Sequence, residues 1–272
     1  MVQQKELSIT EWVNGLLSKG RNSFTLKEAR KAFSTDSEAA LKLKLNRLSK
    51  KGKVLSVHKG YYVIISHQYA SRGILPPALF IDGLMKFLNR PYYVGLLNAA
   101  AFYGTAHQQP QEYYVFTDFP VLRPTKKKGI KINYISKKVI PVSLLEKKKT
   151  ESGSITISSS SLTAADLIQF DKRIGGLDRA AAVLKELTEE IKPNSIKGEF
   201  FKQVPVAVIQ RLGFLLERLL QRYKLADYLF EQSRKKHLRF FRVPLKTTSA
   251  TKGFPTDEKW KVIMNAQIEI DE

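Results

Sequence analysis

The sequence predicts an α+β protein of two domains, for three reasons. Its 272 residues are about twice the size of a common single domain. Helical and β-rich segments fall into two blocks, a short N-terminal block and a longer one in which both types alternate. A content of 43% hydrophobic and 10% aromatic residues is sufficient for a buried core. We expect a small N-terminal domain at residues 1–70, a linker and connecting helix at 71–90, and a larger mixed α/β domain at 91–272.

The charge of the chain is strongly positive and unevenly distributed. Lys and Arg number 46 against 25 Asp and Glu, a net charge of +21. Residues 1–70 carry 13 basic and 5 acidic side chains, residues 71–150 carry 13 and 4, and residues 151–272 carry 20 and 16. Such an excess favours a polyanionic partner, above all a nucleic acid, over a merely solubilising surface. The asymmetry predicts that the polyanion binds the first half of the chain.

Two short helices with matching start signals are predicted at the N-terminus. Ser8 is followed three residues later by Glu11, and Thr25 by Glu28. This is the capping-box spacing, in which each of the two side chains bonds the backbone N–H of the other residue. The second helix runs to Phe33, and the N–H groups at its start, beside Thr25, could meet a phosphate.

A third, basic helix is predicted from Asp36 or Ser37 to Gly52. Three leucines recur at the spacing of one helix face and are expected to point inward: Leu41, Leu45 and Leu48. The cationic side chains then lie outside: Lys42, Lys44, Arg47, Lys50 and Lys51.

A β-hairpin is predicted after these helices, from the runs KVLSV and YYVII joined by His58, Lys59 and Gly60. We interpret His58 as a turn residue. Three helices and a hairpin have the order of a winged helix-turn-helix, in which the third helix enters the major groove of DNA and the hairpin, the wing, lies along the backbone or minor groove. Arg47 is the best base reader, because its guanidinium can bond guanine O6 and N7 together. The predicted DNA-contacting residues are Thr25, Lys42, Lys44, Arg47, Lys51, Lys59 and Tyr61.

The second block predicts helices at residues 78–88 and from Pro91 to Gly104, then strands at residues 112–117 and 130–135. We interpret the aromatic residues of 92–103 as core. A strand at SITISS follows, then amphipathic helices over SSLTAADLIQF, GGLDRAAAVLKELTEEI and VPVAVIQRLGFLLERLLQRY, and two C-terminal strands. Basic clusters around Arg123 with Lys126–Lys128, and at Lys147–Lys149, are expected in turns or loops, where a phosphate backbone or an acidic protein could bind them.

No motif of a known enzyme class is recognisable. The chain has no cysteine, so no thiolate metal site or cysteine nucleophile is expected, and its histidines are scattered: His58, His67, His107 and His237. The sharpest enzymatic alternative is a metal-dependent nuclease, but its candidate fragments are incomplete: Asp118, Glu146 with Lys148, and Asp257 with Lys259. We predict no catalysis, no metal and no cofactor.

Targeting and membrane signals are missing from the sequence. The first residues, MVQQKELSIT, lack the apolar stretch of a signal peptide, and the longest apolar runs are too short to span a bilayer. We expect a cytoplasmic protein with no membrane partner.

Several segments resemble the AbiEi-type antitoxins of bacterial toxin–antitoxin and abortive-infection loci. They are TLKEARKAF, KGYYVI, PYYVGLLNAAAFYG, EYYVFT, SSSLTAADLIQF, GGLDRAAAVLKEL and WKVIMN, spread over nearly the whole chain. The resemblance implies a two-domain type IV antitoxin. Its winged helix would bind inverted repeats in its own promoter and repress it, and its C-terminal domain would counteract a nucleotidyltransferase-like toxin, with or without a stable complex. The family's recognition helix falls on Lys42, Lys44, Arg47 and Lys51, and its wing on residues 59–62.

No short motif marks the contact with a toxin. The candidates for this or another partner are basic side chains that we expect at the surface: Lys126, Lys127, Lys128, Lys147, Lys148, Lys149, Arg211, Arg218 and Arg222. The alternative function is a plain winged-helix transcriptional regulator with a C-terminal effector or dimerisation domain. Co-expression with the neighbouring gene separates the two, because only an antitoxin rescues cells from a toxic neighbour.

Overall fold

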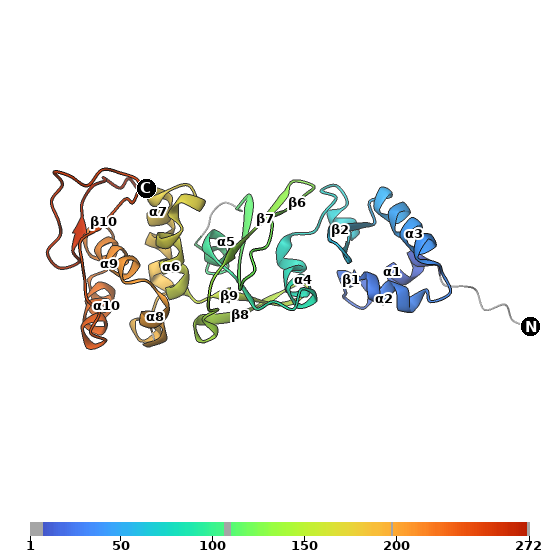
Figure 1. Ribbon diagram of the computed structural model, residues 1–272, viewed down its shortest axis with the longest axis horizontal. Coiled ribbons are helices and arrows are strands. Elements are labelled where there is room, and N and C mark those ends of the chain that lie inside the picture. The colour runs from blue at the N-terminus through green and yellow to red at the C-terminus, as the bar shows by residue number, and fades with distance from the viewer. Residues whose placement is uncertain (1–7, 106–109, 197, 271–272) are drawn as a thin grey trace, which may run out of the picture. The chain divides into compact units, whose positions relative to one another are not determined.

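The computed structural model describes residues 8–105, 110–196 and 198–270 (Figure 1). His107 lies outside the described residues. The described chain contains both helices and strands, with the N-terminal helices followed by a larger α/β part, which confirms the predicted α+β class.

Residues 8–65, here called the N-terminal module, hold three helices and three strands. In chain order these are α1 (Ile9–Ser18), β1 (Ser23–Thr25), α2 (Leu26–Ala32), α3 (Glu38–Lys50), β2 (Val54–His58) and β3 (Tyr61–Ile64). The strands form an antiparallel sheet in the order β1-β3-β2. This order of elements is the one expected of a winged helix-turn-helix.

The start signals of the three helices are confirmed. Ser8 with Glu11 and Thr25 with Glu28 form complete capping boxes, and the Ser37 hydroxyl accepts a hydrogen bond from the Ala40 N–H at the start of α3. Strand β1 was not predicted, because three residues are too short to show an alternating pattern. It forms by pairing with β3, which buries Phe24.

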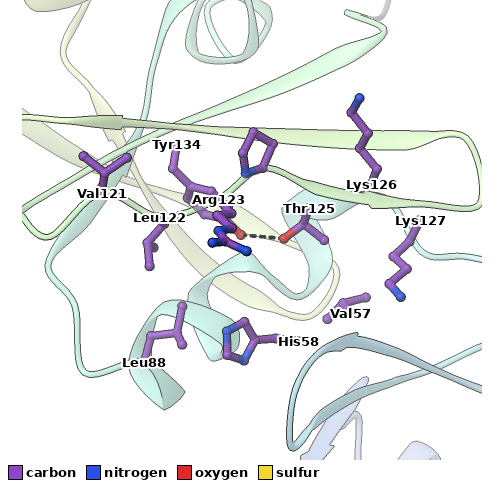
Figure 2. A pocket seen from close by; sticks show the side chains of 11 residues that line it. Val57, His58, Leu88, Val121, Leu122, Arg123, Thr125, Lys126, Lys127 and Tyr134 are labelled. Atoms are coloured by element: carbon purple, nitrogen blue, oxygen red, sulfur yellow. Dashed lines mark hydrogen bonds between the residues drawn. The ribbon is translucent and has the colours of Figure 1, made fainter.

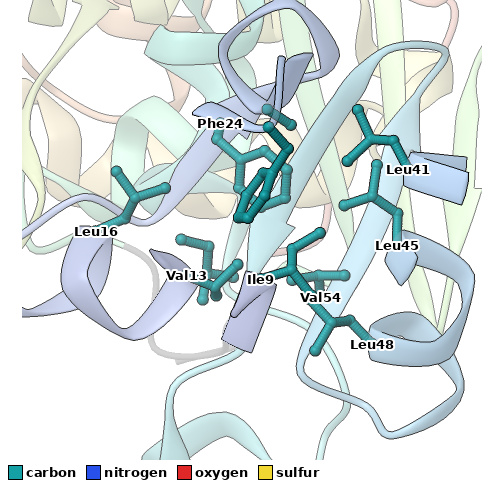
Figure 3. Packing of buried hydrophobic residues seen from close by; sticks show 11 residues of the cluster. Ile9, Val13, Leu16, Phe24, Leu41, Leu45, Leu48 and Val54 are labelled. Atoms are coloured by element: carbon teal, nitrogen blue, oxygen red, sulfur yellow. The ribbon is translucent and has the colours of Figure 1, made fainter. Parts of the chain in front are cut away.

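The core of the N-terminal module gathers side chains from all three helices and the sheet (Figure 3). Leu41, Leu45 and Leu48 of α3 are buried and pack in one cluster with Val13 of α1 and Val54 of β2. Burial of a leucine stabilises a fold by about 2 kcal/mol. The inward face predicted for α3 is therefore confirmed, and it fixes which side chains α3 presents to solvent.

A six-stranded sheet lies in the middle of the sequence. Its strands are β4 (Tyr92–Val94), β5 (Glu112–Thr117), β6 (Thr125–Lys127), β7 (Ile130–Ser136), β8 (Leu145–Thr150) and β9 (Gly153–Ser158), in the order β6-β7-β5-β4-β9-β8. β5 and β7 are parallel, β6 is antiparallel to β7, and β4 and β9 are parallel. The predicted strands at 112–117, 130–135 and SITISS are confirmed.

Three predictions in this part were wrong. The helix expected from Pro91 is strand β4 followed by α5 (Leu96–Ala101), because two tyrosines and a valine favour a strand and Gly95 separates it from the helix. Of the lysines expected in turns or loops, Lys126 and Lys127 lie in strand β6 and Lys147–Lys149 in strand β8, whereas Arg123 and Lys128 lie outside the strands as expected. β6 and β8 are the two edge strands, where lysines protect a sheet from pairing with other chains.

Most of the remaining chain is helical. The helices are α4 (Ile81–Phe87), α6 (Ser160–Gln169), α7 (Leu177–Leu187), α8 (Gly198–Gln203), α9 (Val206–Phe214) with a π-helical continuation (Leu215–Leu219), and α10 (Tyr223–Lys235). The two strands expected at the C-terminal end are only two residues each, β10 (Val243–Pro244) and β11 (Val262–Ile263), and they pair in parallel. Much of the intervening chain there is irregular.

The chain forms two compact units, each assembled from separate segments. The first comprises Met1–Tyr92, Gln111–Ile140 and Lys147–Thr156, and the second comprises Tyr93–Pro110, Pro141–Glu146 and Ile157–Glu272. The boundaries that we predict at residues 70 and 90 stay a prediction. Among the described helices, none is long and apolar enough to cross a membrane.

Candidate nucleic-acid interface

The solvent-facing side of α3 combines cations with two uncharged side chains. Lys42, Leu43, Asn46, Arg47 and Lys50 are all exposed, on the side away from the buried leucines. Charge alone does not single out Leu43 and Asn46. The positions of the three buried leucines place both residues on the opposite, exposed side of the helix, and these positions can be read from the sequence.

Two of the predicted DNA-contacting lysines of α3 carry acidic partners. Lys44 Nζ bonds both carboxylate oxygens of Asp36, at 2.8 and 2.7 Å, and lies 5.5 Å from the centre of the Phe33 ring. Lys42 Nζ lies 2.8 Å from a Glu38 oxygen. The hydrogen bond from Lys42, aided by the charges of Arg30 and Lys42, lowers the pKa of Glu38. Lys44 therefore serves mainly to hold the start of α3, whereas Lys42 remains more than half exposed.

Arg47 and Lys51 keep their charges available. Both side chains are exposed, and neither pairs with an acid among the described residues. Lys50 shares these properties. The C-terminal half of α3 and its C-cap residue Lys51 thus present three cations that an external anion can reach.

The wing is a short hairpin with one cation near its tip. β2 and β3 are joined through Lys59 and Gly60, and Gly60 has a φ of +81°, which a side chain would oppose. Lys59 is exposed. His58, interpreted as a turn residue, ends β2, and its ring lies 6.1 Å from the Phe87 ring.

Tyr61 is a correction, because it is not a surface residue of the wing. It is 2% exposed, and its hydroxyl donates to the Ser23 hydroxyl at 2.7 Å and to the Phe80 carbonyl at 3.4 Å. Burial raises the pKa of Tyr61 to about 12. Its ring packs 5.4 Å from that of Phe87 in α4. Tyr61 fastens the hairpin to α4 and is not available to DNA.

Thr25 is also corrected, from a phosphate contact to a helix cap. Its hydroxyl accepts from the Glu28 N–H, and its own N–H donates to a Glu28 carboxylate oxygen at 2.7 Å. Arg21 lies 2.6 Å from the other oxygen of Glu28. The start of α2 is therefore already capped by a carboxylate of the same module, and the Thr25 hydroxyl is engaged in that cap.

A hollow of about 600 Å³ lies between the wing and residues 121–127 within the first unit (Figure 2). Val57 and His58 line it from the hairpin, and Leu88, Val121, Leu122 and Tyr134 add apolar surface. Its cations are Arg123, Lys126 and Lys127, and none of the described residues that line it is acidic. The Thr125 and Tyr134 hydroxyls are 3.3 Å apart. The hollow therefore attracts anions beside the wing.

The comparison with protein families finds a match for one long segment of the chain. Residues 93–218 match the family model described as the AbiEi antitoxin C-terminal domain. Residues 93–218 therefore form a domain of the AbiEi antitoxin C-terminal type, here called the AbiEi domain. The resemblance noted in the sequence is confirmed for this AbiEi domain.

One solved structure extends the likeness to the fold of nearly the whole chain. It is the crystal structure of the RV2827C protein from Mycobacterium tuberculosis, with a TM-score of 0.67 over 93% of this chain and 90% of that chain. The two sequences are 13% identical, so the likeness concerns the fold. No functionally curated protein matches the chain.

Within the AbiEi domain, one predicted surface cation is buried. Arg211 is 5% exposed and donates to the Leu245 and Ile168 carbonyls at 2.9 and 3.1 Å and to Asp171 at 3.4 Å. Burial lowers the pKa of Arg211 despite the nearby carboxylate. Its role is to join α9 to the end of α6 and to the C-terminal segment. Arg211 is therefore withdrawn as a partner contact.

The other predicted partner contacts are at the surface, some of them with acidic neighbours. Arg218 lies 2.9 Å from Asp257, and Arg222 lies 3.1 Å from Glu189. Lys126, Lys127 and Lys128 are exposed, as are Lys147 and Lys149, which alternate with the half-buried Lys148 along β8.

The acidic residues of the nuclease alternative lie apart in the described part of the chain. None of its His, Asp and Glu side chains form a group of three that could hold a metal ion. Of the nuclease fragments, Asp118 pairs with Arg90 at 3.0 Å, and Asp257 accepts from the Trp260 N–H at 2.7 Å. Both carboxylates are thus engaged in structural contacts.

Proposed function

We propose that this protein is an antitoxin that binds its own promoter through the N-terminal module and counteracts a nucleotidyltransferase-like toxin through the AbiEi domain. The proposed target is double-stranded DNA with inverted repeats, and the proposed place of action is the cytoplasm. The observation that carries the DNA-binding part is the exposed face of α3. It offers Arg47, Lys50 and Lys51 without acidic partners among the described residues, while three buried leucines hold the helix rigidly.

The chemistry of this face suits the major groove. An α-helix fits the groove, and an arginine can bond guanine O6 and N7 with two parallel hydrogen bonds. Lysines contribute phosphate contacts, which add affinity without sequence preference. In our proposal Arg47 reads a base, Lys42, Lys50 and Lys51 hold phosphates, and Lys59 of the wing holds the neighbouring backbone.

A titration with the DNA upstream of the gene tests the DNA-binding part. Arg47→Ala should reduce affinity for the preferred site by about 1–3 kcal/mol and relax the sequence preference. Lys59→Ala should instead weaken binding to all DNA sequences alike. It should also reduce the slope of log affinity against log salt concentration by about one. If Arg47→Ala binds the preferred site as tightly as the wild type does, Arg47 is not a base reader.

Co-expression tests the antitoxin part. The chain should restore growth to cells that express the neighbouring gene, and an Arg47→Ala variant should do so equally well, because neutralisation is assigned to the AbiEi domain. Failure to restore growth, with DNA binding intact, would favour the alternative of a plain transcriptional regulator. The basic edge strands β6 and β8 are the proposed regions of contact with the toxin or with additional DNA, since their lysines face solvent.

A further inference from the structure

The outermost ridge of α3 is formed largely by uncharged side chains. Successive residues of an α-helix are rotated by about 100°, so the ridge directly opposite the three buried leucines passes through Ala39, Leu43, Asn46 and Lys50. Lys42 and Arg47 flank this ridge, one on each side. A helix that docks into a groove presents its outermost ridge to the groove floor, and long side chains on or beside this ridge can reach base edges or phosphates.

Leu43 is unusual for its position. It is 52% exposed, and among the described residues of the N-terminal module it is the only large apolar side chain that is fully at the surface. A single exposed leucine is common on protein surfaces. Here, however, it stands near the middle of a helix whose other exposed side chains, apart from the small Ala39, are polar or charged. Asn46, one turn further on, is exposed without a hydrogen-bond partner among the described residues.

We infer that Leu43 and Asn46 read bases, with Leu43 against the C5-methyl group of a thymine and Asn46 on the N6 and N7 atoms of an adenine. This inference rests on the proposed function. The major groove is where thymine exposes its methyl group and adenine its N6 and N7 edge, and an asparagine amide bonds these two adenine atoms together. Together with Arg47 on a guanine, the exposed face of α3 carries readers for three different bases.

The spacing of the two residues fits consecutive base pairs. Three residues along an α-helix advance by about 4.5 Å, close to the rise of about 3.4 Å between base pairs. Arg47 follows Asn46 directly and points to the side of the ridge. The half-site read by α3 should therefore contain a thymine, an adenine and a guanine contact within about three base pairs.

The charge around Leu43 favours DNA over another copy of this chain. Lys42, Arg47 and Lys50 surround it, and two such faces brought together would repel each other. The same cations attract the phosphates on both sides of a major groove.

The test changes one chemical group of one base at a time in the DNA. The wild-type chain first selects a preferred duplex from a random pool, and each thymine is then replaced by deoxyuridine, which lacks only the methyl group. At one thymine in each half-site, this replacement should lower the affinity of the wild type about fourfold, which corresponds to the loss of one buried methyl group. Leu43→Ala should bind the thymine and deoxyuridine duplexes equally. Replacing the adjacent adenine by 7-deazaadenine should weaken the wild type by about tenfold but leave Asn46→Ala unaffected.

Lys50→Ala is the matched control on the same ridge. It should weaken all duplexes similarly and retain the difference between thymine and deoxyuridine. The inference is overturned if no thymine methyl group matters to the wild type, or if Leu43→Ala still distinguishes the two duplexes. A change of oligomeric state in Leu43→Ala, measured by sedimentation, would assign Leu43 to a contact between copies and overturn it too. Failure of the wild type to select any duplex would remove the DNA-binding proposal itself.

Discussion

At the scale of single residues, burial separates the cations that can meet a partner from those that hold the fold. Arg47 and Arg211 are indistinguishable by charge, yet Arg47 faces solvent and Arg211 is enclosed by two carbonyls and Asp171. The α9 sequence alone does not predict this, because the acid and carbonyls that receive Arg211 come from segments distant along the chain. The leucine spacing of α3, by contrast, is local and predicts its exposed face correctly.

Replacing Arg211 by methionine should destabilise the AbiEi domain strongly. The change leaves the Asp171 carboxylate, whose side chain is 8% exposed, without its charge partner. Breaking a buried ion pair from one side costs about 3–5 kcal/mol. Denaturant unfolding measures the loss. Arg222→Met, which removes an exposed pair with Glu189, should cost less than about 1 kcal/mol. Equal losses in the two variants would contradict the buried role of Arg211.

The capping carboxylate of Glu28 should make stability depend on pH. Burial tends to raise the pKa of Glu28, but hydrogen bonds from Thr25 and Arg21 outweigh it and hold the pKa below its ordinary value of 4.5. A pKa that is lower in the folded chain contributes stability above the unfolded value, and this contribution is lost as the pH falls through the folded value. The stability difference between wild type and Glu28→Gln should therefore be constant above about pH 6 and shrink below about pH 4.5.

The Thr25→Ala variant provides the control for this pH dependence. It removes one hydroxyl bond to the Glu28 carboxylate, so the pH range over which the difference shrinks should move toward 4.5. It should also cost about 1 kcal/mol at neutral pH through loss of the cap. Because Thr25 is assigned to the cap, Thr25→Ala should leave the affinity for DNA unchanged under conditions in which the variant is folded. A reduced affinity would restore Thr25 to the DNA interface.

At the scale of elements, a helix or strand is best predicted from the sequence when the residues that define it, such as a helix cap or a buried face, all lie within one segment. Helices α1 to α3 and strands β5 and β7 meet this condition. Strands β6 and β8 do not, since both are lysine-rich edges whose strand conformation depends on pairing with a neighbour. Strand β4 is also hard to predict, because its three residues are too few to show an alternating pattern and helix α5 follows directly.

The packing of α9 against Trp260 depends on Gly213. Trp260 is fully buried, and its indole ring occupies the place of a Cβ atom at Gly213. Its indole N–H donates to Glu217 in the π-helical segment at 2.8 Å. Gly213→Ala should cost about 1–3 kcal/mol by overpacking, even though alanine favours helices by about 1 kcal/mol over glycine. Tryptophan fluorescence in a Trp12→Phe background reports unfolding around Trp260.

The control is Gly15→Ala in α1. A Cβ at Gly15 meets no atom within 4 Å, so this change should stabilise the chain by up to about 1 kcal/mol. If Gly213→Ala were stabilising as well, the contact between α9 and Trp260 would not be as close as described.

At the scale of the whole molecule, the charge distribution decides which partner each region meets. The first 150 residues carry most of the net positive charge, and they include α3, the wing and the lysines of β6 and β8. The sequence predicts this asymmetry directly. It does not predict that the cations of β6 share a hollow with the wing, because that depends on pairing of strands distant along the chain.

Replacing Lys126, Lys127 and Lys128 by glutamine should show whether DNA reaches beyond the N-terminal module. Each lysine that contacts a phosphate contributes about 0.9 to the slope of log affinity against log salt, so the slope should fall by about 1 to 3. The matched control changes three exposed lysines of the second unit, Lys224, Lys235 and Lys252, and should leave the slope unchanged. Equal decreases in both variants would mean that only net charge matters. An unchanged slope, together with loss of rescue in co-expression with the neighbouring gene, would assign these three lysines to the toxin and not to DNA.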